Sequence, residues 1–281
     1  MPSPRRLVLE VGNSRWKAGL FAPAVPSGSP GENARPPAPL ASLRVAHGEA
    51  PGPPLQAFLA EHAAGATLEP AIWAGVNPAG AAALLSAWPA DCGPPPTELS
   101  RATLDRLIEN HTCKPERVGT DRLLNALAAA ALAPPDRYFL TVADCGTATT
   151  VDQVGLHADR RPAFLAGAIL PGVILCTRAL HTQTALLPEV TFEANAPADG
   201  LDTEAAIRRG VLEMQAAALD RLLTDDSIRL LDGTVPDQHR EIWPVLTGGA
   251  ASLIADRLRL VRPTIVPHLT LIGLALAAEA T

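Results

Sequence analysis

The sequence lacks paired cysteines, an excess of basic residues and long apolar runs, and each absence excludes a class of protein. Its four cysteines form no CxxC pair and have no histidine at ligand spacing, so we expect neither a disulfide framework nor a zinc site. With 29 acidic against 23 basic residues the net charge is −6, which disfavours nucleic acid as a partner. No apolar run is long enough for a membrane span or a signal peptide, so we expect a cytoplasmic protein without a membrane partner.

The 281 residues do have apolar content, 47%, which suffices for one large domain or two compact ones. The segments Arg6–Val11 and Trp16–Phe21 are apolar runs joined by turn residues, and they predict a β-hairpin. The segment 22–54 is rich in Pro, Gly, Ala and Ser, so we expect a loop-like insertion with at most one strand, at Leu40–Val45.

Predicted strands and helices alternate along the rest of the chain, which favours an α/β architecture. The predicted helices are Leu55–Ala63, Ala79–Trp88, Asp121–Leu132, Leu201–Leu223, and two near Ser252–Leu258 and Leu269–Ala280. The predicted strands are Pro70–Val76, Tyr138–Ala143, Thr149–Val154, Ala163–Ile169 and Ile242–Leu246. The seven histidines, including His47, show no ligand spacing, and we expect surface or core-edge positions for them.

Two segments of the sequence repeat each other, Leu7–Ser14 and Thr141–Ala148. Each has an apolar strand, an acidic residue, one spacer, a glycine and then small residues. Such self-similarity predicts a duplicated domain in which both copies offer the same turn to a common cleft. We therefore expect a first domain over residues 1–118, with the insertion at 22–54, and a second over residues 119–281.

The chemistry of these turns suits a nucleotide. Glycine permits close approach, and successive backbone N–H groups of a tight turn can point at one phosphate. The acidic residues Glu10 and Asp144 would lie at strand ends, where a carboxylate can hold a cation against phosphate oxygens. Lys17 could add a positive charge, and the late turn Thr247–Gly249 could pass beneath an adenosine. One such turn alone is typical of an ordinary hairpin, but this combination, in this order, favours a nucleotide site.

Further motifs carry a family resemblance: Gly119–Arg122 (sequence GTDR), then 144–152, 167–173 and 202–207. In order and spacing these motifs resemble those of the type III pantothenate kinases. That family belongs to the superfamily of acetate and sugar kinases, Hsp70 and actin. The resemblance covers nearly the whole chain outside residues 22–54. It implies two ribonuclease H-like domains of the actin-like ATPase superfamily, with mixed sheets flanked by helices. It also implies ATP-dependent phosphorylation of pantothenate to 4′-phosphopantothenate, the first step of coenzyme A biosynthesis.

The same resemblance implies roles for single residues. Asp121 would be the catalytic base that accepts the proton of the pantothenate hydroxyl during its attack on the γ-phosphate of ATP. The substrate-binding residues would be Gly119, Thr120, Arg122 and Thr203. The ATP-binding residues would be Glu10, Gly12, Asn13, Ser14, Lys17 and Thr147. Asp144 would hold a monovalent cation, K⁺ or NH₄⁺, Mg²⁺ would accompany ATP, and the protein would be a homodimer.

Purely structural roles remain open for these residues. Asp121 and Thr203 would also suit helix starts, and Arg122 a solvent-exposed ion pair. Two positions depart from the family pattern: Glu10 replaces the usual Asp, and Thr112 stands where an aromatic residue is common. These departures motivate a second hypothesis, a homologue of impaired catalysis that acts as an accessory or regulatory binding protein. A third hypothesis is another small-molecule kinase of the same superfamily.

Overall fold

The computed structural model describes residues 4–22, 38–193, 196–225 and 241–281. These residues form two compact units, one from Met1–Leu132 with His268–Thr281 and the other from Ala133–Pro267. Residues 23–37 of the predicted insertion lie outside the described residues. The described part of the insertion contains strand β3, Ala41–Ala46, which confirms the single strand expected there.

The first unit contains a mixed sheet with the strand order β3-β2-β1-β5-β6, and β4 pairs with β1 at one end. Its strands are β1 (Pro4–Val11), β2 (Arg15–Phe21), β3 (Ala41–Ala46), β4 (Thr67–Leu68), β5 (Ile72–Gly75) and β6 (Thr97–Glu98); a short strand, β7 (Glu109–Asn110), follows later in the chain. Its helices are α1 (Gly52–His62), α2 (Pro78–Ser86), α3 (Arg101–Leu107), α4 (Thr120–Leu132) and α8 (Leu269–Ala278), with 3₁₀ turns at Ala90–Cys92 and Pro115–Arg117.

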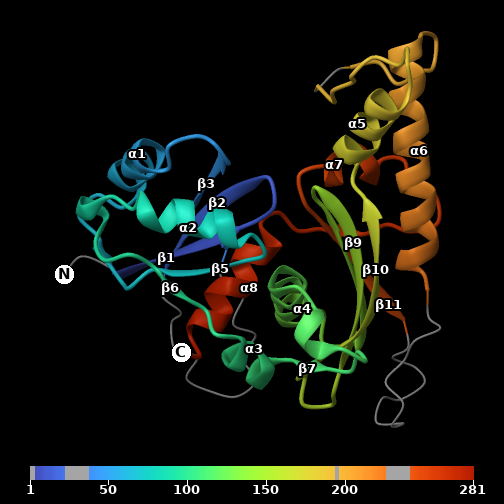
Figure 1. The fold of residues 1–281 in the computed structure, drawn as a ribbon. Coiled ribbons are helices and arrows are strands. Elements are labelled where there is room, and N and C mark those ends of the chain that lie inside the picture. Colours follow the sequence, from blue (N-terminus) through green and yellow to red (C-terminus); the bar gives the residue numbers. More distant parts are fainter. Residues whose placement is uncertain (1–3, 23–37, 194–195, 226–240) are drawn as a thin grey trace. The chain divides into compact units, whose positions relative to one another are not determined.

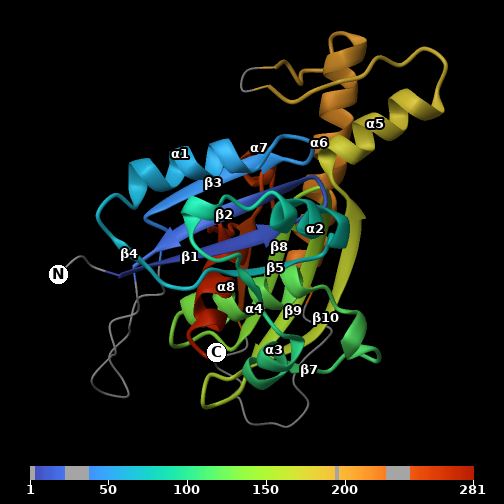
Figure 2. The same cartoon turned by 60° about the vertical axis from the view of Figure 1, so that its left-hand side comes forward.

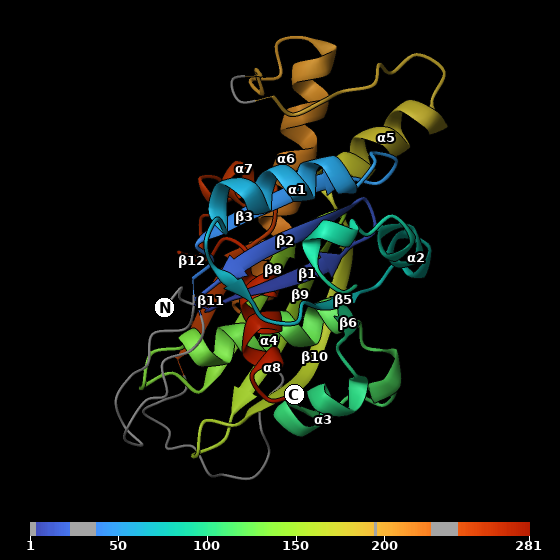
Figure 3. The same cartoon turned by 90° about the vertical axis from the view of Figure 1, so that its left-hand side faces the viewer.

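Side-chain alternation explains how this sheet is covered. Leu7, Leu9 and Val11 of β1 face one side, where they share a core with Leu55 of α1 and Leu84 of α2. Helix α8 packs on β1 and β2 and also on α4, and Figure 3 shows α4 and α8 on the side of the sheet away from α1. The sheet is therefore buried on both faces, which suits the apolar run of β1.

Helices α4 and α8 cross closely, and this crossing assigns both to the first unit. A Cβ on Gly273 of α8 would overlap the carbonyl oxygen of Leu124, so only glycine allows this approach. Nearby, the buried hydroxyl of Thr270 donates a hydrogen bond to Asn125 Oδ1 at 2.9 Å. The sequence placed α4 at the start of the second half, whereas this packing joins it to the first unit. The division into functional domains at residues 118 and 119 stays a prediction.

The second unit contains a mixed sheet with the strand order β12-β11-β8-β9-β10. Its strands are β8 (Phe139–Cys145), β9 (Ala148–Leu156), β10 (Pro162–Pro171), β11 (Ile242–Thr247) and β12 (Thr264–Ile265); its helices are α5 (Val173–Gln183), α6 (Thr203–Leu223) and α7 (Ala251–Ala255). Helix α5 follows directly from the end of β10, and α6 is the long helix beside the sheet (Figures 1 and 2). Buried side chains of all three helices share a core with β8, β9 and β11.

The two sheets repeat one topology. In the first, β1 pairs antiparallel with β2, β2 pairs antiparallel with β3, and β5 joins β1 in parallel. In the second, β8, β9 and β10 form the same antiparallel series, and β11 joins β8 in parallel. This is the ribonuclease H-like arrangement, so the predicted α/β class with two mixed sheets flanked by helices is confirmed. In the described part of the chain, no helix has the length and apolar character to cross a membrane.

Candidate active site

The hairpin of β1 and β2 carries five of the six predicted ATP-binding residues. The Gly12 N–H donates to the Arg15 carbonyl at 3.0 Å and closes the turn. Glu10 and Lys17 are direct cross-strand partners, and their charged groups lie 2.5 Å apart. Glu10 is buried, with 5% of its surface exposed. A Cβ at Gly12 would lie 2.9 Å from Glu10 Oε1, so glycine here leaves room for that carboxylate.

This turn and the Gly119–Arg122 segment lie at the same edge of the first sheet. Strands β1 and β5 are parallel, so their carboxyl ends meet there. The N–H of Val76, which follows β5, donates to the Val11 carbonyl at 3.0 Å. A Cβ at Gly119 would be 3.6 Å from Val76 Cγ1. Val76 therefore lies beside both elements, and the structure brings together two motifs separated by about a hundred residues of sequence.

Asp121 is the second residue of α4, and its carboxylate is held at the start of that helix. Asp121 Oδ1 accepts a hydrogen bond from the Arg122 N–H at 2.9 Å. A Cβ at Gly119 would lie only 2.5 Å from the same oxygen, so the position before the helix has to be glycine for this rotamer. The partial positive charge of a helix N-terminus favours the ionised carboxylate that a general base requires. Thr120 and Arg122, its predicted substrate-binding neighbours, are half-buried on the same turn.

Arg101 of α3 anchors the segment that leads into α4, and sequence reasoning missed it. Its guanidinium donates to the Val118 carbonyl at 3.0 Å and to the Pro115 carbonyl at 2.5 Å. Its Nε also donates to Asp105 at 2.8 Å. Arg101 thus fixes the backbone immediately before Gly119, which positions Asp121 indirectly. A lone arginine on a short helix carries no sequence motif that would have shown this.

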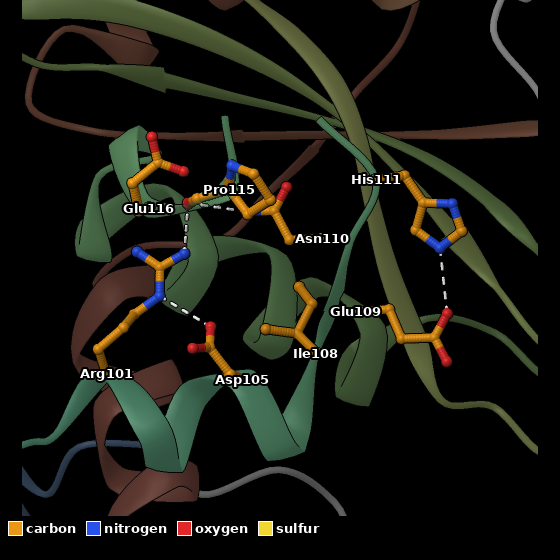
Figure 4. Close-up of a pocket in the computed structure, with 8 residues that line it drawn as sticks. All are labelled: Arg101, Asp105, Ile108, Glu109, Asn110, His111, Pro115 and Glu116. Atoms are coloured by element: carbon orange, nitrogen blue, oxygen red, sulfur yellow. Dashed lines mark hydrogen bonds and ion pairs between the residues drawn. The ribbon is translucent and has the colours of Figure 1, made fainter. Parts of the chain in front are cut away.

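A pocket of about 520 Å³ opens beside this segment in the first unit (Figure 4). It is lined by Arg101, Asp105, Ile108, Glu109, Asn110, His111, Pro115 and Glu116. Thr112, where the family commonly has an aromatic residue, lies on the same stretch of chain. Its N–H and hydroxyl both donate to Asn110 Oδ1, at 3.1 and 2.7 Å, so Thr112 completes a local turn.

In the second unit the structure brings Asp144 and Thr147 together with the late glycine turn. Asp144 lies near the end of β8, opposite Thr247 of β11. Gly248 has φ +95°, and a Cβ there would lie 2.5 Å from both Asp144 Oδ1 and Cys145 N. The Thr147 carbonyl accepts the N–H of Gly172 at 3.1 Å. The predicted cation-binding, ATP-binding and adenosine elements of this half therefore form one cluster of turns.

Cys145, beside Asp144, is a buried thiol. Burial, and to a lesser extent the neighbouring charge of Asp144, raises the pKa of Cys145 from 9.0 to about 12. A thiol with so high a pKa stays protonated at neutral pH and is a poor nucleophile.

Thr203 begins helix α6, and its neighbour Asp202 is the residue that caps that helix. The Asp202 carboxylate accepts the Ala205 N–H at 2.7 Å. Capping therefore does not account for Thr203, and its predicted contact with substrate stays a prediction. Within residues 4–22, 38–193, 196–225 and 241–281, no group of three or more His, Cys, Asp or Glu side chains is placed to hold a metal ion. The carboxylate of Asp144 is nevertheless an oxygen ligand of the kind that hard cations prefer.

Comparison with known proteins identifies the family. The sequence pattern that defines the type III pantothenate kinases matches residues 6–225. A type III pantothenate kinase of Herminiimonas arsenicoxydans is 40% identical over 175 residues, 62% of each chain. One of Synechococcus elongatus is 32% identical over 279 residues, 98% of this chain and 97% of that protein. The chain belongs to the type III pantothenate kinase family, which confirms the resemblance noted in the sequence.

The extent of these matches differs between relatives. The match to the Herminiimonas protein spans about three fifths of that relative's length, whereas the Synechococcus match is nearly complete. Among solved structures, a glucokinase from an Antarctic psychrotroph matches with a TM-score of 0.42 and 10% identity, over 98% of both chains.

Proposed function

We propose that the protein phosphorylates pantothenate with ATP to give 4′-phosphopantothenate, the first step of coenzyme A biosynthesis, in the cytoplasm. Family membership supports this activity. The observation that carries it is the shared edge of the first sheet, where Val76 bonds Val11, the residue before the Gly12 turn, and lies beside Gly119. A phosphate-binding turn beside an oriented carboxylate is what transfer from a nucleotide to an alcohol requires.

In this proposal Asp121 is the general base. Its carboxylate accepts the proton of the primary hydroxyl of pantothenate while the hydroxyl oxygen attacks the γ-phosphorus and ADP leaves. Placement at the start of α4 supports the role, because a helix N-terminus attracts negative charge and the bond from the Arg122 N–H fixes one oxygen of the carboxylate. Arg122 would bind the substrate carboxylate through its planar guanidinium, and Thr203 would contact a substrate hydroxyl.

The backbone N–H groups of the Gly12–Ser14 turn would bind the phosphates, with Lys17 and Glu10 beside them, and Thr147 would be a further ATP contact. Asp144 would hold the monovalent cation, K⁺ or NH₄⁺. Mg²⁺ bound with ATP would offset the charge that develops on the transferred phosphoryl group.

A homodimer is part of the same proposal. Several large apolar side chains of the second unit are exposed within residues 169–214, including Leu186 at 92% and Leu201 at 87%. Exposed large apolar side chains in one part of a protein are typical of an interface. Leu175→Asp on α5 should convert the dimer to monomer in sedimentation experiments. Leu260→Asp, at a site that is 74% exposed outside that segment, is the matched control and should leave the dimer intact.

The test of the activity is a coupled assay of ADP release, with and without pantothenate and with K⁺ present or replaced by Na⁺. We expect release that depends on pantothenate and on K⁺. Asp121→Asn should lower kcat by about 10²- to 10⁴-fold, because it removes the base and keeps the shape. Asp256→Asn, at the exposed end of α7, is the control and should retain wild-type turnover.

Three results would contradict the proposal in different ways. Binding of pantothenate without turnover would indicate the impaired homologue. Turnover of another alcohol in preference to pantothenate would indicate a different small-molecule kinase. Full activity of Asp121→Asn would leave the reaction in place but remove Asp121 as its base.

A further inference from the structure

All three carbonyl groups of the Gly12–Ser14 turn accept hydrogen bonds from outside the hairpin. The Gly12 carbonyl accepts from His47 Nε2 at 2.8 Å. The Asn13 carbonyl accepts a longer bond from Asn77 Nδ2, at 3.4 Å. The Ser14 carbonyl accepts from the backbone N–H of His47 at 3.2 Å. Two residues, one following β3 and one following β5, therefore hold the whole turn.

Holding these carbonyls also fixes the N–H groups of the turn. In a trans peptide unit the C=O of one residue and the N–H of the next point in opposite directions. The described chain contains no cis peptide bond. With the carbonyls of residues 12 and 13 directed at the side chains of His47 and Asn77, the N–H groups of residues 13 and 14 are directed to the opposite side of the turn. That is the side on which a phosphate would bind to backbone donors.

His47 is itself held in place by the first turn of α2. A Cβ on Gly80 would lie 2.6 Å from His47 Cε1, so only glycine leaves room for the imidazole there. Asn77 is the N-cap of α2, and its Oδ1 accepts the Gly80 N–H at 2.9 Å. That cap leaves the amide nitrogen of Asn77 facing the turn, 3.4 Å from His47 Nε2. Because a carbonyl cannot donate, His47 Nε2 must carry the proton in the bond to Gly12.

We propose that His47, assisted by Asn77, is a positioning residue for the phosphates of the nucleoside triphosphate. It acts through the Gly12–Ser14 backbone and does not touch the nucleotide. The inference rests on the proposed function, because it assumes that the turn binds the phosphates of ATP. No sequence pattern indicates this role, since His47 has no ligand spacing and lies 35 residues from Gly12.

Two substitutions of His47 separate the effect of its hydrogen-bond donor from the effect of its side-chain size. His47→Phe keeps a ring of similar size and removes the donor. His47→Gln keeps an N–H donor at about the reach of Nε2. A third variant, Asn77→Asp, keeps the cap on α2 but replaces the donor that faces the Asn13 carbonyl. His62→Phe is the matched control, because it makes the same exchange on α1 of the same unit, where the ring packs on Phe58.

The measurements are the KM for ATP, the KM for pantothenate, kcat, the calorimetric Kd for MgATP and the melting temperature. For His47→Phe we expect the KM and Kd for ATP to rise about three- to tenfold, the effect of one hydrogen bond. The KM for pantothenate and the melting temperature should stay near wild type. Asn77→Asp should act in the same direction, His47→Gln should recover most of the loss, and His62→Phe should match wild type.

The inference is overturned if His47→Phe binds MgATP as tightly as wild type, or if His47→Gln and His47→Phe lose affinity equally. It is also overturned if the KM for both substrates rises together with a lower melting temperature, because that pattern indicates a merely structural residue. These outcomes are distinct from failure of the proposed function. A wild-type protein that binds MgATP without phosphorylating pantothenate refutes the reaction and still allows the calorimetric comparison. A wild-type protein that does not bind MgATP refutes both.

Discussion

The two hairpin turns occupy equivalent places in two sheets of the same strand order, but they are held by different means. Side chains help to hold the first turn, since those of His47 and Asn77 donate to the Gly12 and Asn13 carbonyls in addition to the backbone bonds from His47 and Val76. Backbone contacts hold the second, since the Gly172 N–H donates to Thr147 at 3.1 Å and the Ala250 N–H to Cys145 at 3.0 Å. Substitutions at the first turn should therefore change ligand affinity more than stability, and those at the second should change stability first.

The largest effect should come from Gly248→Ala in the second turn cluster. Gly248 has φ +95°, and its Cβ would lie 2.5 Å from Cys145 N, a backbone atom that cannot move away cheaply. We expect a loss of about 3 kcal/mol in the free energy of unfolding, measured by thermal and urea denaturation. Gly249→Ala is the matched control, because among the described residues no atom lies within 4 Å of its Cβ. Equal losses in the two variants would contradict the close packing of Gly248.

A second comparison exchanges Cys145 for valine, the residue that the first hairpin has at the equivalent position, Val11. The pKa of Cys145 is raised from 9.0 to about 12 by burial and by Asp144. Above pH 9 the unfolded chain loses this proton while the folded chain keeps it, so stability falls as pH rises. The loss amounts to at most about 1.4 kcal/mol per pH unit up to pH 12.

Cys145→Val should remove this part of the pH dependence, as measured by urea denaturation at pH 8, 9 and 10. The difference in unfolding free energy between variant and wild type should shift in favour of the variant as pH rises. Cys113→Val, which replaces an exposed thiol, is the control and should keep the wild-type slope. A constant difference across this pH range would show that Cys145 ionises alike in the folded and unfolded states.

Gly12→Ala should cost less stability than Gly248→Ala, because the new Cβ meets the end of a side chain. It would lie 2.9 Å from Glu10 Oε1, and the carboxylate can turn aside. We expect a loss of about 1 kcal/mol in unfolding free energy and a higher KM for ATP. Adding Glu10→Ala should relieve the crowding, so the two changes together should be less than additive in a double-mutant cycle. Strict additivity would refute the contact.

The smallest effect should come from Glu10→Asp, which gives the first turn the acidic residue of the second. The shorter side chain draws the carboxylate away from Lys17, its cross-strand partner. Because Lys17 is 27% exposed, solvent screens the pair and the loss in unfolding free energy should stay below about 1 kcal/mol. Thermal unfolding at low and high salt measures it. A loss larger than that of Gly12→Ala would show that the ion pair, and not the room left by glycine, governs this turn.

The elements predicted from sequence were those with strong local signals. Both predicted hairpins are confirmed by antiparallel pairing. They were predictable because apolar runs joined by glycine turns define strands without reference to the rest of the chain. Helices α3 and α5 were not predicted. Helix α3 has only seven residues, although Ser100 caps it by accepting the Thr103 N–H at 3.1 Å. A helix that short shows too few turns for periodicity to stand out.

The candidate site was predictable only in part, for the same reason. Gly119, Asp121 and the glycine turns belong to compact motifs, so their positions could be read from the chain. Arg101, His47 and Asn77 act by donating to backbone carbonyls remote in sequence, and any donor of suitable reach could serve. Nothing in the residue types marks such contacts.

The sequence by itself determined the α/β class, the duplicated hairpins and the family, because these depend on local periodicity and on short motifs in a fixed order. Only the tertiary structure decided that α4 packs with α8 in the first unit and that Val76 lies beside both motifs at one sheet edge. It also decided which side chains hold each turn. The physical reason is that close approach and hydrogen bonding between distant segments depend on how the chain packs, which no local pattern records.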